Sequence, residues 1–115
     1  MPRRSLKLAS NVISLGAVPN GPPKHLDSTE ANLYRQIINQ FQIDDAGSIT
    51  LLTVAMEAHM RMRKARERVD ADGEVLLDRF KQHKAHPAIA IERDARAAFL
   101  KAMRALNLDV SGTTR

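Results

Sequence analysis

The chain is short and basic: its 115 residues include 18 Lys and Arg against 13 Asp and Glu, a formal net charge of +5. That length leaves room for one domain. The absence of Cys excludes disulfide bonds, thiol catalysis and cysteine-ligated zinc. No apolar run reaches the about 18–20 residues of a membrane span, and the first residues are too interrupted for a signal peptide. We therefore expect a soluble protein that is not secreted, with an acidic partner such as nucleic acid.

Residues 1–26 are rich in Pro and Gly, show no sustained periodicity and carry no acid. They predict a flexible basic arm, with cations that include Arg3, Arg4 and Lys7. Arms of this kind order on binding, and they can equally be inert linkers. Residues 27–110 form the predicted helical domain, and residues 111–115 a disordered tail.

The first helix is predicted from Ser28 to Gln42. Asp27 and Glu30 have the spacing of a capping box, with Asp in place of the usual Ser or Thr. Apolar residues then recur at helical spacing and predict one core-facing side; they are Leu33, Tyr34, Ile37, Ile38 and Phe41. Residues 43–48 predict a turn.

The second helix is predicted from Ile49 to Ala71, with Asp45 or Ser48 as its N-cap. Its apolar residues alternate steps of four and three, which is the rhythm of a packed seam; they are Leu51, Ala55, Ala58, Met62, Ala65 and Val69. Ala at half of these positions allows a close helix contact, either within the chain or between subunits. The second half of this helix is strongly basic.

The helical pattern is then interrupted from Gly73 to His86 by a basic segment that also carries several apolar residues. It is longer than the about 2–8 residues that a helical hairpin needs. Its apolar residues are strand-like, namely Val75, Leu76, Leu77 and Phe80, and its cations are Arg79, Lys81 and Lys84. We expect the 74–85 connector to form a β-hairpin or loop that contacts a neighbouring subunit or a polyanion.

The third helix is predicted to begin at Pro87, which suits a first helical turn, and to end near Leu106. Asn107 is expected to adopt a left-handed cap. Packing antiparallel to the second helix would bury the Ala-rich faces of both. The predicted fold class is mainly α, with three helices and a long antiparallel helical hairpin.

Signals for catalysis and metal binding are poor, and we expect no enzyme, no cofactor and no metal site. The chain lacks a phosphate-binding Gly-rich loop and a Gly-x-Ser-x-Gly elbow. The adjacent Asp44 and Asp45 suit helix capping better than acid–base chemistry. His83 and His86 have H-x-x-H spacing, but only Asp78 and His59 could complete a metal site. We therefore place His86 at a helix start.

Nucleic-acid binding is the best chemical signal. Arg61, Lys64 and Arg68 share one helix face, with Arg63 and Arg66 beside it. Lys and Arg bind phosphates by charge and counterion release, so no particular motif is required. The connector cations and the arm cations extend the predicted surface. Few aromatic residues are present for stacking on single strands, which favours duplex DNA. Each cation cluster can also be read as an ordinary solvated face.

The order of these features resembles the small terminase subunits of tailed bacteriophages and prophages. The resemblance spans roughly residues 20–110 and rests on the lead-in Gly21–Leu26, Tyr34 in the first helix, and Asp45 before a long helix. It continues with the Asp72-Gly73 break, His86-Pro87, and the closing run from Phe99 to Leu108. The sequence departs from the family in having His86 where Asn is expected and Asn107 where Gly is common, and in lacking Pro after the final cap.

The resemblance implies a DNA-packaging factor that is not an enzyme and acts in the cytoplasm of the bacterial host. Such proteins recognise viral duplex DNA at the packaging start, assemble into rings, and recruit or regulate the large ATPase–nuclease subunit. The residues expected at a subunit interface are Leu51, Ala55, Ala58, Met62, Val75, Leu76, Leu77 and Phe80. Two alternatives remain: a small dimeric DNA-binding transcriptional regulator, and a helical adaptor that binds an acidic protein.

Overall fold

The computed structural model describes residues 21–108 of the chain. It contains three helices and two short strands, in the order α2 (Ser28–Phe41), α3 (Ala46–Asp72), β1 (Val75–Leu77), β2 (His83–Ala85) and α4 (Pro87–Leu106). The mainly helical fold is therefore as predicted. The predictions for residues 1–20 of the arm and for the tail at 111–115 lie outside the described residues. No helix in the described part is long and apolar enough to cross a membrane.

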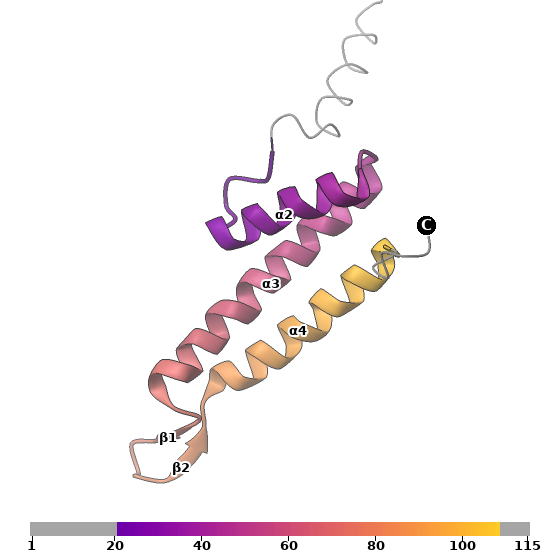
Figure 1. Cartoon of the computed structure of the whole chain (residues 1–115). Helices are drawn as coiled ribbons and strands as arrows, with labels where there is room; N and C mark the ends of the chain where they lie inside the picture. The colour runs from indigo at the N-terminus through magenta and orange to yellow at the C-terminus, as the bar shows by residue number, and fades with distance from the viewer. Residues whose placement is uncertain (1–20, 109–115) are drawn as a thin grey trace, which may run out of the picture.

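The two long helices form the body of the molecule. In Figure 1, α3 and α4 run side by side in opposite directions, α2 lies across the first half of α3, and the two strands project from the far end. This is the predicted antiparallel helical hairpin. The arrangement leaves α2 at one end of the α3–α4 pair and the strands at the other.

The long helix begins and ends at residues with clear local reasons. A side-chain oxygen of Asp45 accepts the backbone N–H of Ser48 at 2.9 Å, so Asp45 is the N-cap and α3 begins at Ala46, earlier than predicted. The helix ends before Gly73, whose φ of 89° and ψ of 156° lie in a region essentially restricted to glycine. Asp72-Gly73 therefore works as the predicted break.

The predicted capping box at the start of α2 is wrong. Asp27 occupies the N-cap position, but its side chain makes no capping hydrogen bond. Glu30 is turned inward and has no exposed surface. Both carboxylates bind groups on α3 instead, because a partly buried arginine there, Arg63, offers stronger, charge-assisted hydrogen bonds than the local backbone does.

The helix α4 begins and ends where the sequence predicted. Nδ1 of His86 accepts the backbone N–H of Ala88 at 3.0 Å, and Nε2 donates to a carboxylate oxygen of Asp72 at 2.9 Å. His86 thus caps α4 and also ties its start to the end of α3. At the other end, Asn107 adopts the left-handed conformation, with φ of 55°.

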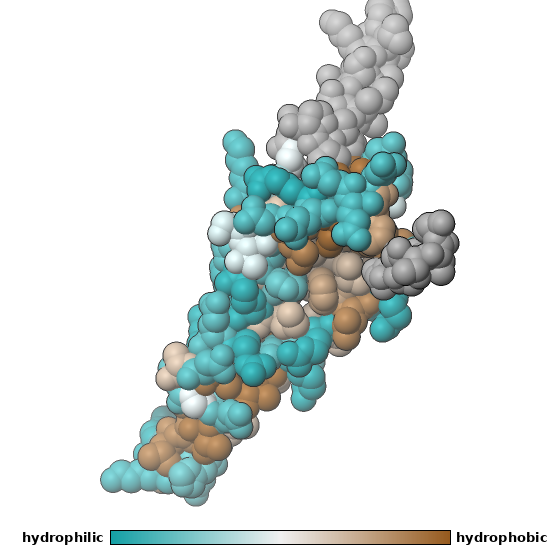
Figure 2. Space-filling model, viewed as in Figure 1, coloured by the Kyte–Doolittle hydropathy of each residue, from teal (hydrophilic) through white to brown (hydrophobic). Residues whose placement is uncertain are grey.

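The connector forms an antiparallel β-hairpin, as one of the two expected alternatives. Val75 pairs with Ala85, Leu76 with Lys84, and Leu77 with His83. Directly opposed residues share a face of a hairpin and successive residues alternate. One face therefore carries Val75 and Leu77, and the other carries Leu76 and Lys84. Figure 2 shows hydrophobic atoms gathered at this end of the molecule.

A network of side-chain and backbone hydrogen bonds centred on Asp78 closes the hairpin loop. Oδ1 of Asp78 accepts the backbone N–H groups of Phe80 at 2.8 Å and of Gln82 at 2.9 Å. The backbone N–H of Asp78 donates to the carbonyl of Gln82, and Lys81 takes a left-handed conformation with φ of 63°. Asp78 is thereby engaged in shaping the loop.

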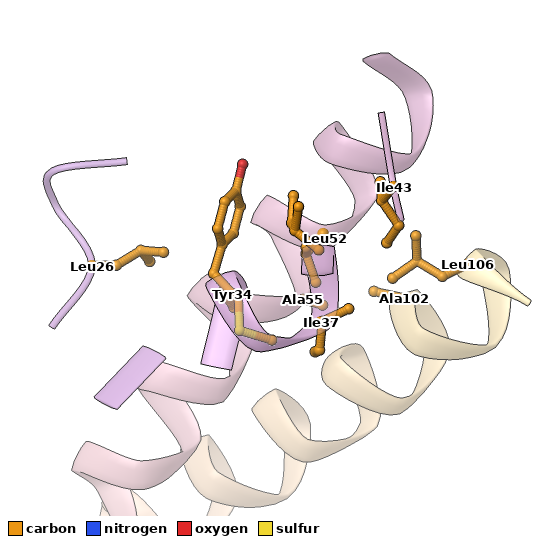
Figure 3. Close-up of a cluster of buried hydrophobic side chains, with 10 residues drawn as sticks. Leu26, Tyr34, Ile37, Ile43, Leu52, Ala55, Ala102 and Leu106 are labelled. Atoms are coloured by element: carbon orange, nitrogen blue, oxygen red, sulfur yellow. The ribbon is translucent and has the colours of Figure 1, made fainter. Parts of the chain in front are cut away.

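The main core lies where α2 crosses α3 and α4. Leu52 and Met56 of α3 have no exposed surface, and Tyr34 of α2 is 3% exposed. Figure 3 shows Leu52 and Tyr34 converging with residues from the ends of all three helices, including Ala102 and Leu106. Tyr34 is thus a core residue, as predicted. Leu26, from the segment assigned to the arm, also packs into this core.

A second, much smaller core lies near the strands. It consists of Ala65, Val69 and Ala88, with Ile89 packed against it. Alanine and valine bury little apolar surface, so this end of the helical hairpin is held by fewer hydrophobic contacts than the end beneath α2.

Candidate nucleic-acid and subunit interfaces

A buried carboxylate links α2 to α3. The two oxygens of Glu30 accept from Nε and Nη2 of Arg63, each at 2.9 Å, and Oε2 also accepts from Nδ1 of His59 at 2.6 Å. Nη2 of Arg63 donates to Asp27 at 2.8 Å. The ring of His59 meets Phe99 of α4 edge-on, with centroids 5.2 Å apart. This set, the Glu30 cluster (Asp27, Glu30, His59 and Arg63), therefore contacts all three helices.

The groups of the Glu30 cluster shift one another's pKa. Burial alone would raise the pKa of Glu30, but hydrogen bonds from Arg63 and His59 outweigh it, and the pKa lies below its ordinary value of 4.5. Hydrogen bonds from Arg63 and Lys64 lower the pKa of Asp27, and those to Glu30 and Asp27 raise the pKa of Arg63. The guanidinium of Arg63 is thus committed to acids of its own chain.

A second arginine links α3 to α4. Nη1 of Arg66 donates to Glu92 at 3.2 Å and Nε donates to Asp70 at 3.2 Å. Glu92, only 9% exposed, also accepts from Arg96 at 2.8 Å. These hydrogen bonds, Glu92 first, raise the pKa of Arg66. Arg66 therefore serves the packing of the two long helices.

The remaining predicted DNA contacts fall into two groups. Lys64 lies 3.3 Å from Asp27, with both side chains well exposed, so this pair holds the lysine only weakly. Within residues 21–108, no ion pair is formed by Arg61, Arg68, Arg79, Lys81 or Lys84. We call these five the free cations. Arg3, Arg4 and Lys7 lie outside the described residues.

Two exposed cations of α4 were not among the predicted contacts. Lys101 and Arg104 are exposed and form no ion pair with any residue of the described part. The signal that could have identified them is the count of cations along the third helix, where Arg93, Arg96, Lys101 and Arg104 follow one another. The apolar spacing of that helix indicates its buried face and says nothing about which of its exposed cations are unpaired.

The residues predicted at a subunit interface differ in how much of each side chain is exposed. Ala55 has no exposed surface because α2 and α4 pack over it, so it belongs to the core of a single chain and leaves the predicted interface. Leu51, Ala58, Met62 and Leu76 are half-buried. The hairpin residues are the most accessible: Val75 is 55%, Leu77 62% and Phe80 69% exposed.

A shallow groove of about 400 Å³ runs between α3 and α4 on one side of the molecule. Small residues line it, namely Ala58, Ala95 and Ala98, and two larger apolar residues flank them, Val54 at 46% and Ile91 at 42% exposed. Glu57, Arg61 and Asp94 contribute the charged part of its lining. We call this the α3–α4 groove.

The histidines do not assemble a metal site in the described part of the chain. Both ring nitrogens of His86 are taken, one by the N-terminus of α4 and the other by Asp72. No group of three or more potential ligands lies together within residues 21–108. The H-x-x-H spacing of His83 and His86 thus reflects a β-strand followed by a helix cap.

Comparison with known protein families identifies the family of this chain. The family model described as phage terminase, small subunit, matches residues 32–115, which is well over half of the sequence. The chain belongs to the phage terminase small subunit family. Searches of curated proteins and of solved structures gave no match. Membership supports a role in phage DNA packaging, and the family is generally a non-catalytic, regulatory subunit.

Proposed function

We propose that this protein is an oligomeric packaging factor that binds phage duplex DNA at the packaging start and recruits or regulates the large ATPase–nuclease subunit. Its family membership carries this proposal. The geometry supports it because the chain keeps free cations on a helical scaffold and leaves apolar side chains exposed at one end.

DNA binding is assigned to the free cations and to Arg3, Arg4 and Lys7 of the arm. Arg61 and Arg68 are seven residues apart on α3, about two helical turns, and therefore lie on the same side of it. Lys84 lies on the strand that follows the hairpin loop. Arg63 is left out of the proposed contacts, because the buried Glu30 binds its guanidinium group. Arg66 is bound by Glu92 and Asp70, but its side chain is 58% exposed, so these pairs hold it only weakly and it stays at the edge of the proposed surface. Phosphate contacts by these cations position the protein, and the shape of the DNA supplies specificity.

The ends of α2 and α3 do not favour a helix-turn-helix mode of DNA binding, the mode that a small dimeric transcriptional regulator could use. A recognition helix reads bases with its N-terminal residues. Here that end of α3 follows Asp44 and Asp45, and α3 carries no Lys or Arg before Arg61. Two carboxylates at this position repel phosphates. The basic half of α3 lies toward the hairpin instead.

Assembly into a ring would strengthen DNA binding without new contacts. A modest basic surface, repeated in each copy, gains avidity when several copies engage one duplex. Mass determination separates the candidates: a large closed oligomer supports the packaging factor, a dimer supports the regulator, and a single chain that binds no DNA supports the adaptor.

Salt dependence tests the electrostatic part. The affinity for a labelled duplex, measured by fluorescence anisotropy, should fall steeply between about 50 and 200 mM salt, because each phosphate contact releases counterions. The double variant Arg68→Glu/Lys84→Glu should bind at least about tenfold more weakly, with a shallower salt slope. An affinity that hardly changes with salt would contradict the proposal.

A matched control separates a local site from overall charge. Lys24→Glu/Arg35→Glu changes the net charge equally but alters exposed cations outside the predicted surface. It should weaken binding much less. Equal losses in the two double variants would mean that only the net charge matters. Oligomer mass must be unchanged in both, and copurification with the large subunit tests recruitment separately.

A further inference from the structure

Two apolar surfaces of this chain lack a partner within the described residues. The first is the outer face of the β-hairpin, formed by Val75 and Leu77, with Phe80 at the loop; we call it the hairpin face. Each of these side chains is more than half exposed. Burying a large apolar side chain is worth about 1.5–3 kcal/mol. Three of them together at one tip are typical of a protein contact.

The second surface is the α3–α4 groove. Its alanines leave space between the helices, while Val54 and Ile91 stand on either side of it. Its volume of about 400 Å³ is within the range of pockets that take compact apolar groups. The groove is thus shaped for one or two large apolar side chains rather than for a flat surface.

The charges around the two surfaces are complementary. Arg79 lies over the ring of Phe80, with its guanidinium carbon 5.1 Å from the ring centre, and Lys81 follows it. The acids that line the groove are Glu57 and Asp94, against one lining cation, Arg61. Glu57 hydrogen-bonds His25, and Asp94 forms an exposed and therefore weak ion pair with Arg93. The hairpin acid nearest the tip, Asp78, is held by backbone N–H groups of its own loop. A tip with one more cation than acids therefore meets a groove whose lining has one more acid than cations.

The hairpin cannot fill the groove of its own chain. Ala58 precedes the end of α3 at Asp72 by a distance of about 21 Å along the helix. Figure 1 shows the hairpin projecting away from α3 and α4 rather than folding back over them. Within residues 21–108, no apolar side chain of the hairpin can therefore fill the groove of its own chain, and one from a second copy can.

We propose that the hairpin face of one copy docks into the α3–α4 groove of the next copy. This inference rests on the proposed oligomeric function and names the surfaces that carry it. Because the two surfaces differ, each copy keeps one free hairpin and one free groove after a first contact. Such head-to-tail contacts form a ring when the rotation between copies closes. Lys84 lies on the other face of the hairpin and stays free for DNA. Arg61, Arg79 and Lys81 lie at the contact itself, so in the assembled protein DNA binding falls to Arg68, Lys84 and the arm cations.

Cross-linking tests the pairing directly, since the natural chain has no Cys. The double variant Leu77→Cys/Ala98→Cys, treated with a short bismaleimide, should give a ladder of covalent oligomers beyond the dimer on a denaturing gel. A dimer alone would mean reciprocal exchange between two copies and would overturn the ring contact. A mixture of the two single variants should cross-link, whereas Leu77→Cys by itself should not.

A control pair of cysteines and the oligomeric state of the unmodified protein distinguish a wrong surface pairing from a failure to assemble. Leu77→Cys paired with Asn39→Cys, an exposed position on α2, should give no ladder. If the unmodified protein oligomerises but only the control pair cross-links, the surface pairing is wrong and the proposed assembly stands. If the unmodified protein stays a single chain at high concentration, both are wrong.

Charge exchange gives an independent test. Phe80→Asp should weaken association at least about tenfold while leaving the helical circular dichroism unchanged. Arg79→Glu and Asp94→Arg should each weaken association, and the double variant should recover part of the loss. Equal, additive losses without recovery would contradict the proposed contact between hairpin and groove.

Discussion

The two ends of the helical hairpin differ in how much apolar surface they bury. Under α2, apolar residues of three helices bury one another, and Leu52 and Met56 lose all exposure. Near the strands, only Ala65, Val69 and Ala88 form a buried cluster, and the hairpin leaves Leu77 62% exposed. The core beneath α2 is therefore closed within one chain, although Val54 and Leu100 stay exposed outside it, whereas most apolar side chains at the hairpin end are exposed.

The cations of α3 also fall into two kinds, those that acids of the chain bind and those that have no acidic partner in the described part of the chain. Arg63, beneath α2, is bound by Glu30, Asp27 and Glu67. Toward the other end, Arg68 has no acidic partner among the described residues. A basic residue held by acids maintains the fold, while one without them is available to a polyanion. The acids around each cation therefore distinguish them: Arg63 and Arg66 are paired with acids of the chain, while Arg61 and Arg68, which flank them along α3, are not paired within the described residues.

The largest expected effect contrasts apolar truncations at the two ends. Leu52→Ala removes a fully buried side chain and should cost about 4 kcal/mol of unfolding free energy, through lost transfer energy and a cavity. Leu77→Ala should cost less than about 0.5 kcal/mol, because its side chain is already exposed. Urea unfolding measures both, at concentrations where light scattering gives the mass of a single chain. Equal losses would mean that the hairpin belongs to the core of the chain.

The next effect contrasts two arginines of α3. Arg63→Ala leaves the buried carboxylate of Glu30 with His59 alone and should cost about 3 kcal/mol, the lower part of the range for breaking a buried ion pair. Arg68→Ala should stay within about 0.5 kcal/mol, because its side chain is exposed and has no acidic partner in the described part of the chain. DNA affinity, measured on the same proteins, should follow the opposite order. A stable Arg63→Ala protein would show that the Glu30 cluster does not hold α2.

A smaller loss of stability is expected at the Asp72-Gly73 break, and a substitution at a second glycine serves as its control. Gly73→Ala forces a side chain into a conformation with φ of 89° and should cost about 2 kcal/mol. Gly47→Ala is the control, because the new methyl group lies in the helix at ordinary contact distance, 3.6 Å from Asp45. That variant should be neutral or more stable by about 0.5–1 kcal/mol. Thermal unfolding of both variants compares them.

The smallest effect is a dependence on pH. Because the pKa of folded Glu30 lies below its ordinary value of 4.5, its stabilisation is complete above that pH and is lost as pH falls through the lowered folded pKa. Asp27 acts in the same direction. Unfolding free energy measured from pH 6 to pH 3 should therefore decline, and Glu30→Gln should flatten the decline. An unchanged slope in that variant would assign the acid sensitivity to other carboxylates.

Local signals predicted most of the fold. Pro87, Asn107 and Asp72-Gly73 set helix ends through the backbone conformations that their own residues favour, and the structure confirms those ends. The strand-like character of Val75–Leu77 likewise matches a strand. These features depend on neighbours a few residues away, so a single sequence contains them.

The candidate site was predicted only in part, because its decisive contacts are distant in sequence. Glu30 was interpreted as a capping residue of its own helix, yet it binds an arginine 33 residues later. Arg63 and Arg68 have the same charge and lie on the same helix, so residue type could not separate them. The free cations became distinguishable only once the acids around each were placed.

The sequence by itself determined the helical elements, the basic balance and the family, because periodicity, capping and motif order are local properties of the chain. The tertiary structure decided which charges are free and which apolar residues are exposed. Both depend on the packing of α2 and α4 against α3, which brings residues together across long stretches of chain. Packing therefore assigns Arg63 to the fold and exposes Leu77 at the hairpin face.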